Sequence, residues 1–265
     1  MALIETTFRS FTLKRSVTFT ALIPADRDSQ PEQGYKHVNN QFKTLYLLHG
    51  YTGNHRDFIR LSNIGSLADT LGMAIIFPSG ENSFYLEDRE LGTNHSNYVG
   101  IELVEFTRSI FPLSRNREDT FIGGISMGAY GALINGLRYT KTFSRILSLS
   151  GAFIELDIAD CGTTLSDEVF SEAFQRRIFG DPGMLRQSDK DPRFLIEQLL
   201  NRGRSIPRIF QICGTDDVLI RVNRTLDQFL VSHGVEHIYR EDQGAHDWDF
   251  WNSNLEECLE WLIED

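Results

Sequence analysis

The sequence predicts an α/β fold built on one mixed, mostly parallel sheet with helices on both faces. Short runs of almost purely apolar residues recur along the chain, and longer segments with helical periodicity lie between them. Such runs are typical of strands that are covered on both faces, as in a parallel sheet. Strands that alternate with helices of about 10 to 15 residues indicate βαβ units. The 265 residues are sufficient for a single domain of this class.

The predicted strands follow in chain order. β-Branched and aromatic residues near the N-terminus predict short strands at 11–13 and 17–23. The polar segment 26–42 contains proline and glycine and is expected to be an exposed loop. The remaining strands are the apolar runs at 45–48, 73–77, 120–122, 146–149 and 209–212.

Helical periodicity marks four segments, at 97–111, 129–137, 222–233 and 254–263. The segment 152–205 breaks the alternation of strand and helix because it is polar and is interrupted by glycine and proline. We expect it to form a small cap-like insertion over the sheet of an otherwise single domain, 1–265.

Composition and charge exclude several classes of protein. The net charge of −11 comes without any basic run, which argues against nucleic-acid binding. The three cysteines form no CxxC pair, which argues against a disulfide framework and a four-thiolate zinc site. No run of about 18 apolar residues predicts a membrane span, and the N-terminus lacks the features of a signal peptide. A cytoplasmic protein is expected.

A serine motif lies between an apolar run and a helical pattern. Gly124-Ile-Ser126-Met-Gly128 has the form G-x-S-x-G, which places a serine on a strained strand-to-helix turn with its hydroxyl exposed. The flanking glycines are needed where a Cβ would collide with a neighbouring strand or helix. A Gly-rich packing turn is the alternative interpretation of this pentapeptide. No Lys-Ser/Thr pair follows the glycines, so a phosphate loop is not predicted.

A serine nucleophile needs a base and an orienting carboxylate. In α/β-hydrolases these follow in the order Ser, Asp/Glu, His, each in a loop after a strand. Asp217 follows the apolar run 209–212, and His246 lies in a Gly-containing loop before the last helix. Asp216 competes for the role of the acid, and we favour Asp217, with Asp216 as the turn-forming residue.

The tetrahedral oxyanion needs two backbone N–H donors. Met127, directly after the nucleophile, is the first, and Tyr51 in the segment His49-Gly50-Tyr51-Thr52-Gly53 is the second. We interpret His49 as a structural residue of this loop. No histidine spacing typical of a metal site occurs, so neither a metal nor another cofactor is predicted.

The combination LYLLHGYTGNHRDF, FPSGENSFYLED, GISMGAYGAL, CGTDDVL and GAHDWDFW resembles the esterase D family of serine hydrolases. Within that family the sequence is most similar to bacterial tributyrin esterases, and the resemblance extends over about 11–261. It implies an α/β-hydrolase fold, a triad of Ser126, Asp217 and His246, and oxyanion donors at Tyr51 and Met127. The family's serine motif usually ends in Met-Gly-Gly, whereas this chain has alanine at its last position.

These residues favour a serine carboxylesterase that cleaves short-chain acyl esters through an acyl-enzyme. A feruloyl or acetyl esterase of sugar esters and an S-formylglutathione hydrolase are alternatives with the same machinery. An acyltransferase and a non-catalytic binding protein with a hydrolase fold are more distant alternatives for the function. The expected partner is a small-molecule ester, and the resemblance is compatible with a homo-oligomer. Four aromatic residues close to the motif loops are candidates for the wall of the acyl pocket, although core packing explains each of them equally well: Phe84, Tyr85, Trp248 and Trp251.

Overall fold

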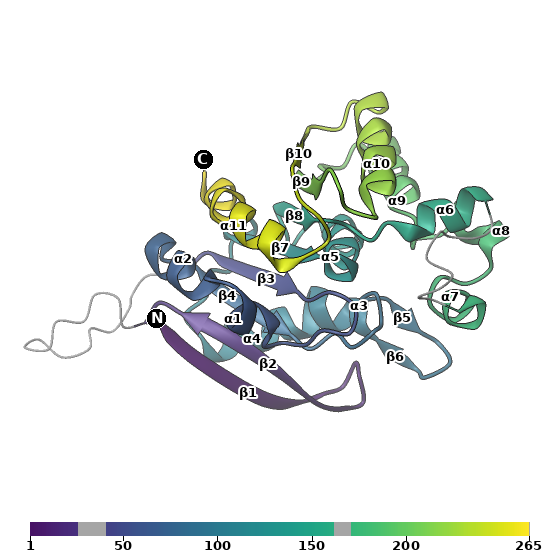
Figure 1. The fold of residues 1–265 in the computed structure, drawn as a ribbon. Helices are drawn as coiled ribbons and strands as arrows, with labels where there is room; N and C mark the ends of the chain where they lie inside the picture. The colour runs from purple at the N-terminus through teal and green to yellow at the C-terminus, as the bar shows by residue number, and fades with distance from the viewer. Residues whose placement is uncertain (26–40, 162–170, 265) are drawn as a thin grey trace, which may run out of the picture.

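An eight-stranded sheet runs through the molecule, and helices cover both of its faces (Figure 1). The computed structural model describes residues 1–25, 41–161 and 171–264. In spatial order the strands are β1 (Ala2–Ser10), β2 (Arg15–Ile23), β4 (Ala74–Pro78), β3 (Thr44–Leu48), β7 (Thr120–Ile125), β8 (Arg145–Leu149), β9 (Arg208–Gly214) and β10 (His237–Asp242). β1, β2 and β4 pair antiparallel, and every other pair is parallel. The predicted fold class is therefore confirmed.

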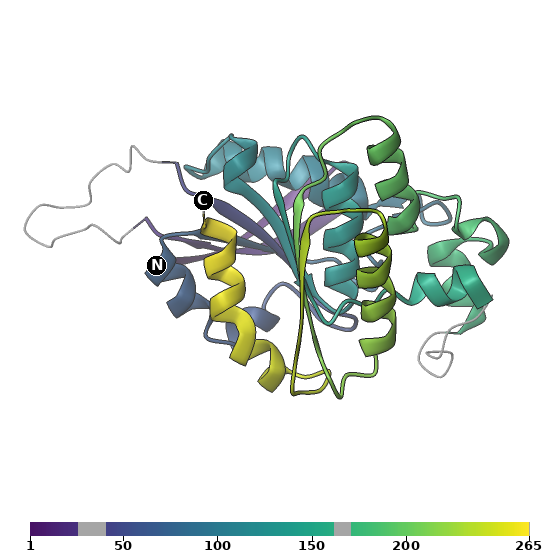
Figure 2. The ribbon, with the colours of Figure 1, turned by 90° about the horizontal axis from the view of Figure 1, so that it is seen from above.

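The helices form two layers, which separate clearly in the view from above (Figure 2). One layer packs on the side chains of Leu45, Leu47 and their neighbours and contains α1 (Asp57–Leu61), α2 (Ile64–Leu71) and α11 (Trp248–Ile263). The other packs on the alternate side chains, such as Tyr46 and Leu48, and contains α4 (Leu103–Ile110), α5 (Met127–Arg138), α9 (Pro192–Asn201) and α10 (Ile220–Ser232). Both faces of the central strands are therefore buried, which explains why these strands are apolar throughout.

Of two local predictions near the N-terminus, one is wrong and the other falls mostly outside the described residues. Residues 11–13 form the turn between β1 and β2 and not a strand. The strand β1 was missed because its side chains alternate between half-buried and exposed, so that it has no continuous apolar run. Most of the predicted loop 26–42 lies outside the described residues.

The helix predicted at 97–111 is divided into three pieces. It begins with the single turn α3 (His95–Asn97), continues as a π-helical turn at Tyr98–Glu102 and ends as α4. Gly100 in the π-helical turn lies against the ring of Tyr139, where an added Cβ would come within 2.1 Å of a ring carbon. A small hairpin of β5 (Glu87–Asp88) and β6 (Thr93–Asn94) precedes α3.

The predicted insertion 152–205 contains two different structures. α6 (Ile154–Cys161), α7 (Glu172–Phe179) and α8 (Pro182–Leu185) extend beyond the end of the sheet, beside the β5–β6 hairpin (Figure 1). By contrast, α9 packs against α5 in the main helical layer, so we use the name cap for α6, α7 and α8 alone. In the described part of the chain, no helix has both the length and the apolar character needed to cross a membrane.

Candidate active site

Ser126 occupies a sharp turn between β7 and α5. Its φ of 55° and ψ of −119° place this non-glycine residue in a strained region, and its N–H donates to the Leu149 carbonyl at 3.0 Å. The two flanking glycines have no room for a side chain. A Cβ on Gly124 would lie 2.4 Å from the Gly128 carbonyl carbon, and one on Gly128 would lie 2.2 Å from the Leu48 oxygen. The motif therefore has the strand–turn–helix geometry that its sequence predicts.

The structure brings Ser126, His246 and Asp217 into one hydrogen-bonded chain. His246 Nε2 lies 3.0 Å from Ser126 Oγ, and Nδ1 lies 2.9 and 3.1 Å from the two carboxylate oxygens of Asp217. These side chains follow β7, β10 and β9, whose carboxyl ends lie at one edge of the parallel sheet. A carboxylate on Nδ1 favours the tautomer that leaves Nε2 free to accept a proton from the serine.

The loops of the acid and the histidine are in direct backbone contact. The Asp216 N–H donates to the Gly244 carbonyl at 2.9 Å, and a Cβ on Gly214 would lie 2.2 Å from the same oxygen. Asp216 itself is exposed, whereas the carboxylate of Asp217 is fully buried. The structure thus places Asp217, and not Asp216, against the histidine.

Asp217 is held in its ionised form although it is buried. Burial alone raises the pKa of a carboxyl group, but hydrogen bonds from His246, Leu219 N–H and Ser150 outweigh burial and hold the pKa of Asp217 below its usual value. The Ser150 hydroxyl also accepts a hydrogen bond from Trp251 Nε1 at 3.1 Å. Ser150 was not predicted as a site residue, since a single serine after a strand has no distinctive sequence signal.

The two predicted oxyanion donors flank the serine. Met127 is the first residue of α5, where a backbone N–H has no acceptor within the helix. Tyr51 lines the same pocket as Ser126, and the preceding Gly50 is so close that its Cβ would touch Ser126 Cβ at 3.4 Å. The Tyr51 loop and the N-terminus of α5 therefore both adjoin Ser126.

His49 fixes the base of this loop. The Gly80 N–H donates to His49 Nε2 at 2.8 Å, so the proton resides on Nδ1, which donates to the Gly50 carbonyl at 2.8 Å. Burial lowers the pKa of His49 below its usual value, which keeps the ring neutral. These contacts are consistent with the structural role that we expected from the sequence.

A small cavity of about 220 Å³ opens beside the serine. Its walls include Trp248 and Trp251, as predicted from their place next to the histidine. The ring of Trp251 stands perpendicular to that of His246, with the ring centres 5.2 Å apart. Asp57, at the start of α1, also lines this cavity and was not predicted.

The prediction that Phe84 and Tyr85 line the pocket is wrong. Both side chains are fully buried, and neither lies in the wall of the cavity beside Ser126. Tyr85 fills the space next to Gly80 and Gly131 and donates its hydroxyl to the His49 carbonyl at 3.1 Å. Phe84 packs against other aromatic rings of the core, among them Phe179 with ring centres 5.0 Å apart. Their role is to support the loops behind the site.

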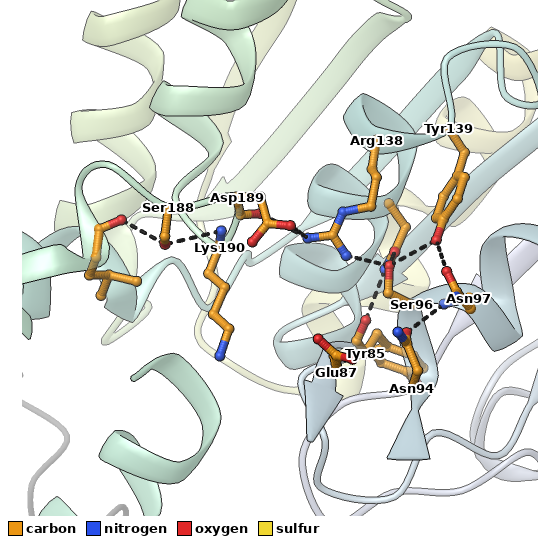
Figure 3. Close-up of polar contacts among 12 residues, drawn as sticks. Tyr85, Glu87, Asn94, Ser96, Asn97, Arg138, Tyr139, Ser188, Asp189 and Lys190 are labelled. Atoms are coloured by element: carbon orange, nitrogen blue, oxygen red, sulfur yellow. Dashed lines mark hydrogen bonds and ion pairs between the residues drawn. The ribbon is translucent and has the colours of Figure 1, made fainter. Parts of the chain in front are cut away.

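A larger cavity, of about 530 Å³, lies elsewhere, between α7–α8, the β5–β6 hairpin and the end of α5 (Figure 3). Its wall includes Arg138, the last residue of α5, which is about 18 Å along the helix axis from Ser126. Arg138 is paired with Asp189 at 2.8 Å, and Arg177 with Asp88 at 2.6 Å. This cavity contains none of the predicted site residues.

Within the described residues, no group of three or more His, Cys, Asp or Glu side chains is arranged to hold a metal ion. Ser126, His246 and Asp217 are the side chains that the structure joins by hydrogen bonds at the site. A hydroxyl, an imidazole and a carboxylate in this geometry can carry out nucleophilic acyl transfer.

Comparison with known proteins agrees with this chemistry. The family model described as Esterase matches residues 13–262. The chain is 44% identical over 263 residues to an acetyl esterase of Caldicellulosiruptor saccharolyticus, covering 99% of this chain and 98% of that protein. Two structures from Staphylococcus aureus are each 25% identical. One is a substrate-bound fluorophosphonate-binding serine hydrolase (TM-score 0.85, covering 100% of this chain and 99% of the other), and the other is an S-formylglutathione hydrolase (TM-score 0.84, covering 99% of each).

Proposed function

Because the chain belongs to the Esterase family, we propose that it is a serine carboxylesterase that hydrolyses short-chain acyl esters. The observation that carries this proposal is the hydrogen-bonded chain from Ser126 through His246 to Asp217, at a strained turn beside a small cavity. We further propose that its activity resembles that of the bacterial tributyrin esterases of the esterase D family.

In the proposed mechanism, His246 Nε2 takes the proton of Ser126 as Oγ attacks the ester carbonyl. Asp217 stabilises the imidazolium that forms, and the N–H groups of Tyr51 and Met127 stabilise the oxyanion. His246 then gives the proton to the leaving alcohol, which departs and leaves the acyl group on Ser126. Water, deprotonated by the same histidine, attacks the acyl-enzyme and restores the free serine.

The size of the cavity supports a small ester. Pockets for drug-sized ligands usually measure about 300–1,000 Å³, whereas the cavity beside Ser126 measures about 220 Å³. The identity of 44% with an acetyl esterase supports the same proposal. We propose acetyl to butyryl esters as the substrates, with a small-molecule ester as the partner and the cytoplasm as the location.

A second candidate is the hydrolysis of S-formylglutathione. It is favoured by the similarity to the S-formylglutathione hydrolase structure, which extends over 99% of both chains. The same triad can cleave a thioester, and formyl is the smallest acyl group. An enzyme of this kind should prefer the thioester to oxoesters by orders of magnitude.

The test is to measure kcat/KM for 4-nitrophenyl acetate, butyrate, octanoate and ferulate, and for S-formylglutathione, with Ser126→Ala as the control. We expect acetate or butyrate to be the best substrate and the variant to be inactive. A preference for ferulate would favour sugar-linked substrates, and a preference for the thioester would favour the second candidate. Activity that persists in Ser126→Ala would refute the proposed nucleophile.

A further inference from the structure

The cavity beside Ser126 contains a charged group that the proposed mechanism does not use. Its walls are formed mainly by glycine backbone, tryptophan rings and the reacting side chains, and Asp57 is the only carboxylate among the described lining residues. The side chain is half-buried. The neighbouring Arg56 pairs with Glu5 instead, and none of the ion pairs between described residues includes Asp57. A leaving group that enters the cavity therefore meets one negative charge without a counter-ion.

The position of this carboxylate is fixed by the loop that carries Tyr51. Asp57 Oδ2 accepts the Asn54 N–H at 3.0 Å. The same oxygen occupies the space where Gly53 has no side chain, since a Cβ there would lie 2.4 Å from it. The charge thus lies against the segment that holds one of the proposed oxyanion donors, in the wall of the cavity beside Ser126.

We infer that Asp57 selects substrates by charge, favouring esters with a neutral or cationic leaving group and rejecting those with an anionic one. This inference rests on the proposed esterase function and specifies the substrate class for the same site. Two like charges in a partly buried site repel more strongly than in water, because the surroundings screen them less. Specificity frequently arises from such a repulsive element.

The inference also separates the two candidate functions. A glutathione thioester carries more carboxylate than ammonium groups, so the charge of Asp57 disfavours it. An acetylated sugar or a simple alkyl acetate carries no charge and is not affected. Asp57 therefore favours the carboxylesterase over the thioesterase.

The experiment uses three acetate esters that differ in the charge of the leaving group. Acetylcholine is cationic, 3,3-dimethylbutyl acetate is its neutral isostere, and 4-acetoxybutanoate is anionic. All three form the same acetyl-enzyme, so differences in kcat/KM report the acylation step alone. The enzymes are wild type, Asp57→Asn and a control, Asp249→Asn, which changes the net charge equally at an exposed position outside the cavity wall.

We expect the ratio of kcat/KM for the cation to that for the anion to fall about tenfold in Asp57→Asn, or about 1.4 kcal/mol. It should change less than twofold in Asp249→Asn, and the wild-type ratio should fall in high salt. The asparagine retains an oxygen to accept the Asn54 N–H, and a purely structural role of Asp57 would lower all three rates together. Dividing each rate by the rate for the neutral ester removes a loss that affects all three substrates equally. Asp57→Ser provides a second uncharged variant for the same ratio of kcat/KM values.

An unchanged ratio in both neutral variants would overturn the inference while leaving the esterase proposal intact. If folded wild type hydrolysed none of the three acetates, the esterase proposal itself would fail, and the role of Asp57 with it.

Discussion

Replacing Asp217 by asparagine tests the proposed triad at its acid. Asp217 Oδ1 accepts the Leu219 N–H at 2.8 Å, and Oδ2 faces His246 Nδ1 at 2.9 Å. In Asp217→Asn, the amide oxygen should keep the bond to Leu219, which turns the NH2 group towards the histidine. Nδ1 must then accept a hydrogen bond, so the ring proton moves to Nε2. A protonated Nε2 cannot take the proton of Ser126.

The activity of Asp217→Asn should therefore fall because His246 is in the wrong tautomer, and not because a contact is missing. Such a substitution in a serine protease lowers kcat about 10⁴-fold, which corresponds to ~5 kcal/mol of transition-state stabilisation. We expect a similar loss of kcat for 4-nitrophenyl acetate, with a KM that changes much less. Because the side chain keeps its shape, the melting temperature should fall only slightly.

Asp216→Asn is the matched control, since it removes the same charge from the adjacent, exposed residue. It should retain activity within about twofold of wild type, as expected for a surface substitution away from the reacting groups. If Asp217→Asn retained more than a tenth of the wild-type kcat, the assignment of Asp217 as the orienting acid would be refuted. Equal losses in both variants would instead indicate disruption of the whole loop.

Two further predictions concern stability. Gly128→Ala places a Cβ 2.2 Å from the Leu48 carbonyl oxygen, so it should destabilise the fold by about 3 kcal/mol and lower Tm by roughly 6–12 °C, as thermal denaturation can measure; an unchanged Tm would show that the turn relaxes freely. Glu155 is fully buried, and neither of its carboxylate oxygens has a side-chain or backbone partner among the hydrogen bonds of the described residues; its burial, followed by the nearby Asp191, raises the pKa of Glu155 well above its usual value. The folded protein then keeps a proton that the unfolded chain releases above about pH 4.3, so stability is lost as pH rises. Glu155→Gln should remove this loss of stability. The free energy of unfolding of the variant should exceed that of wild type by an amount that grows between pH 5 and 8 by up to about 1.4 kcal/mol per pH unit. Urea denaturation at both pH values measures this difference, and a difference that does not grow would contradict the prediction.

The parts of the structure that were predictable have signals that follow from burial or chain order. The central strands are apolar on both faces, so their runs are visible without any knowledge of their neighbours. Ser126, Asp217 and His246 each follow a strand in the sequence. Because these strands are parallel, the loops after them meet at the carboxyl ends of the strands. By contrast, β1 is covered on one face only and was missed.

The direction of a side chain is harder to predict than its place in the chain. Phe84 and Tyr85 lie close to a motif, and yet both residues have positive φ angles and side chains buried behind the loops. Asp57 lies far from the serine in the sequence and begins α1, directly after a polar turn of no distinctive pattern. Only the packing of that turn against the loop of Tyr51 brings its carboxylate to the cavity.

The cap and the reacting groups belong to separate parts of the chain. None of the described residues that line the cavity beside Ser126 comes from α6, α7 or α8. Among the ring contacts between the cap and that cavity wall is the one between Phe174 and Tyr51, with ring centres 5.9 Å apart. Relatives could therefore exchange α6, α7 and α8 without rebuilding the triad, provided that Ser150 at the end of β8 is kept. Such an exchange would act on the chemistry through contacts such as that of Phe174 with Tyr51 in the loop of the oxyanion donor. New specificities could then be grafted onto unchanged catalytic residues.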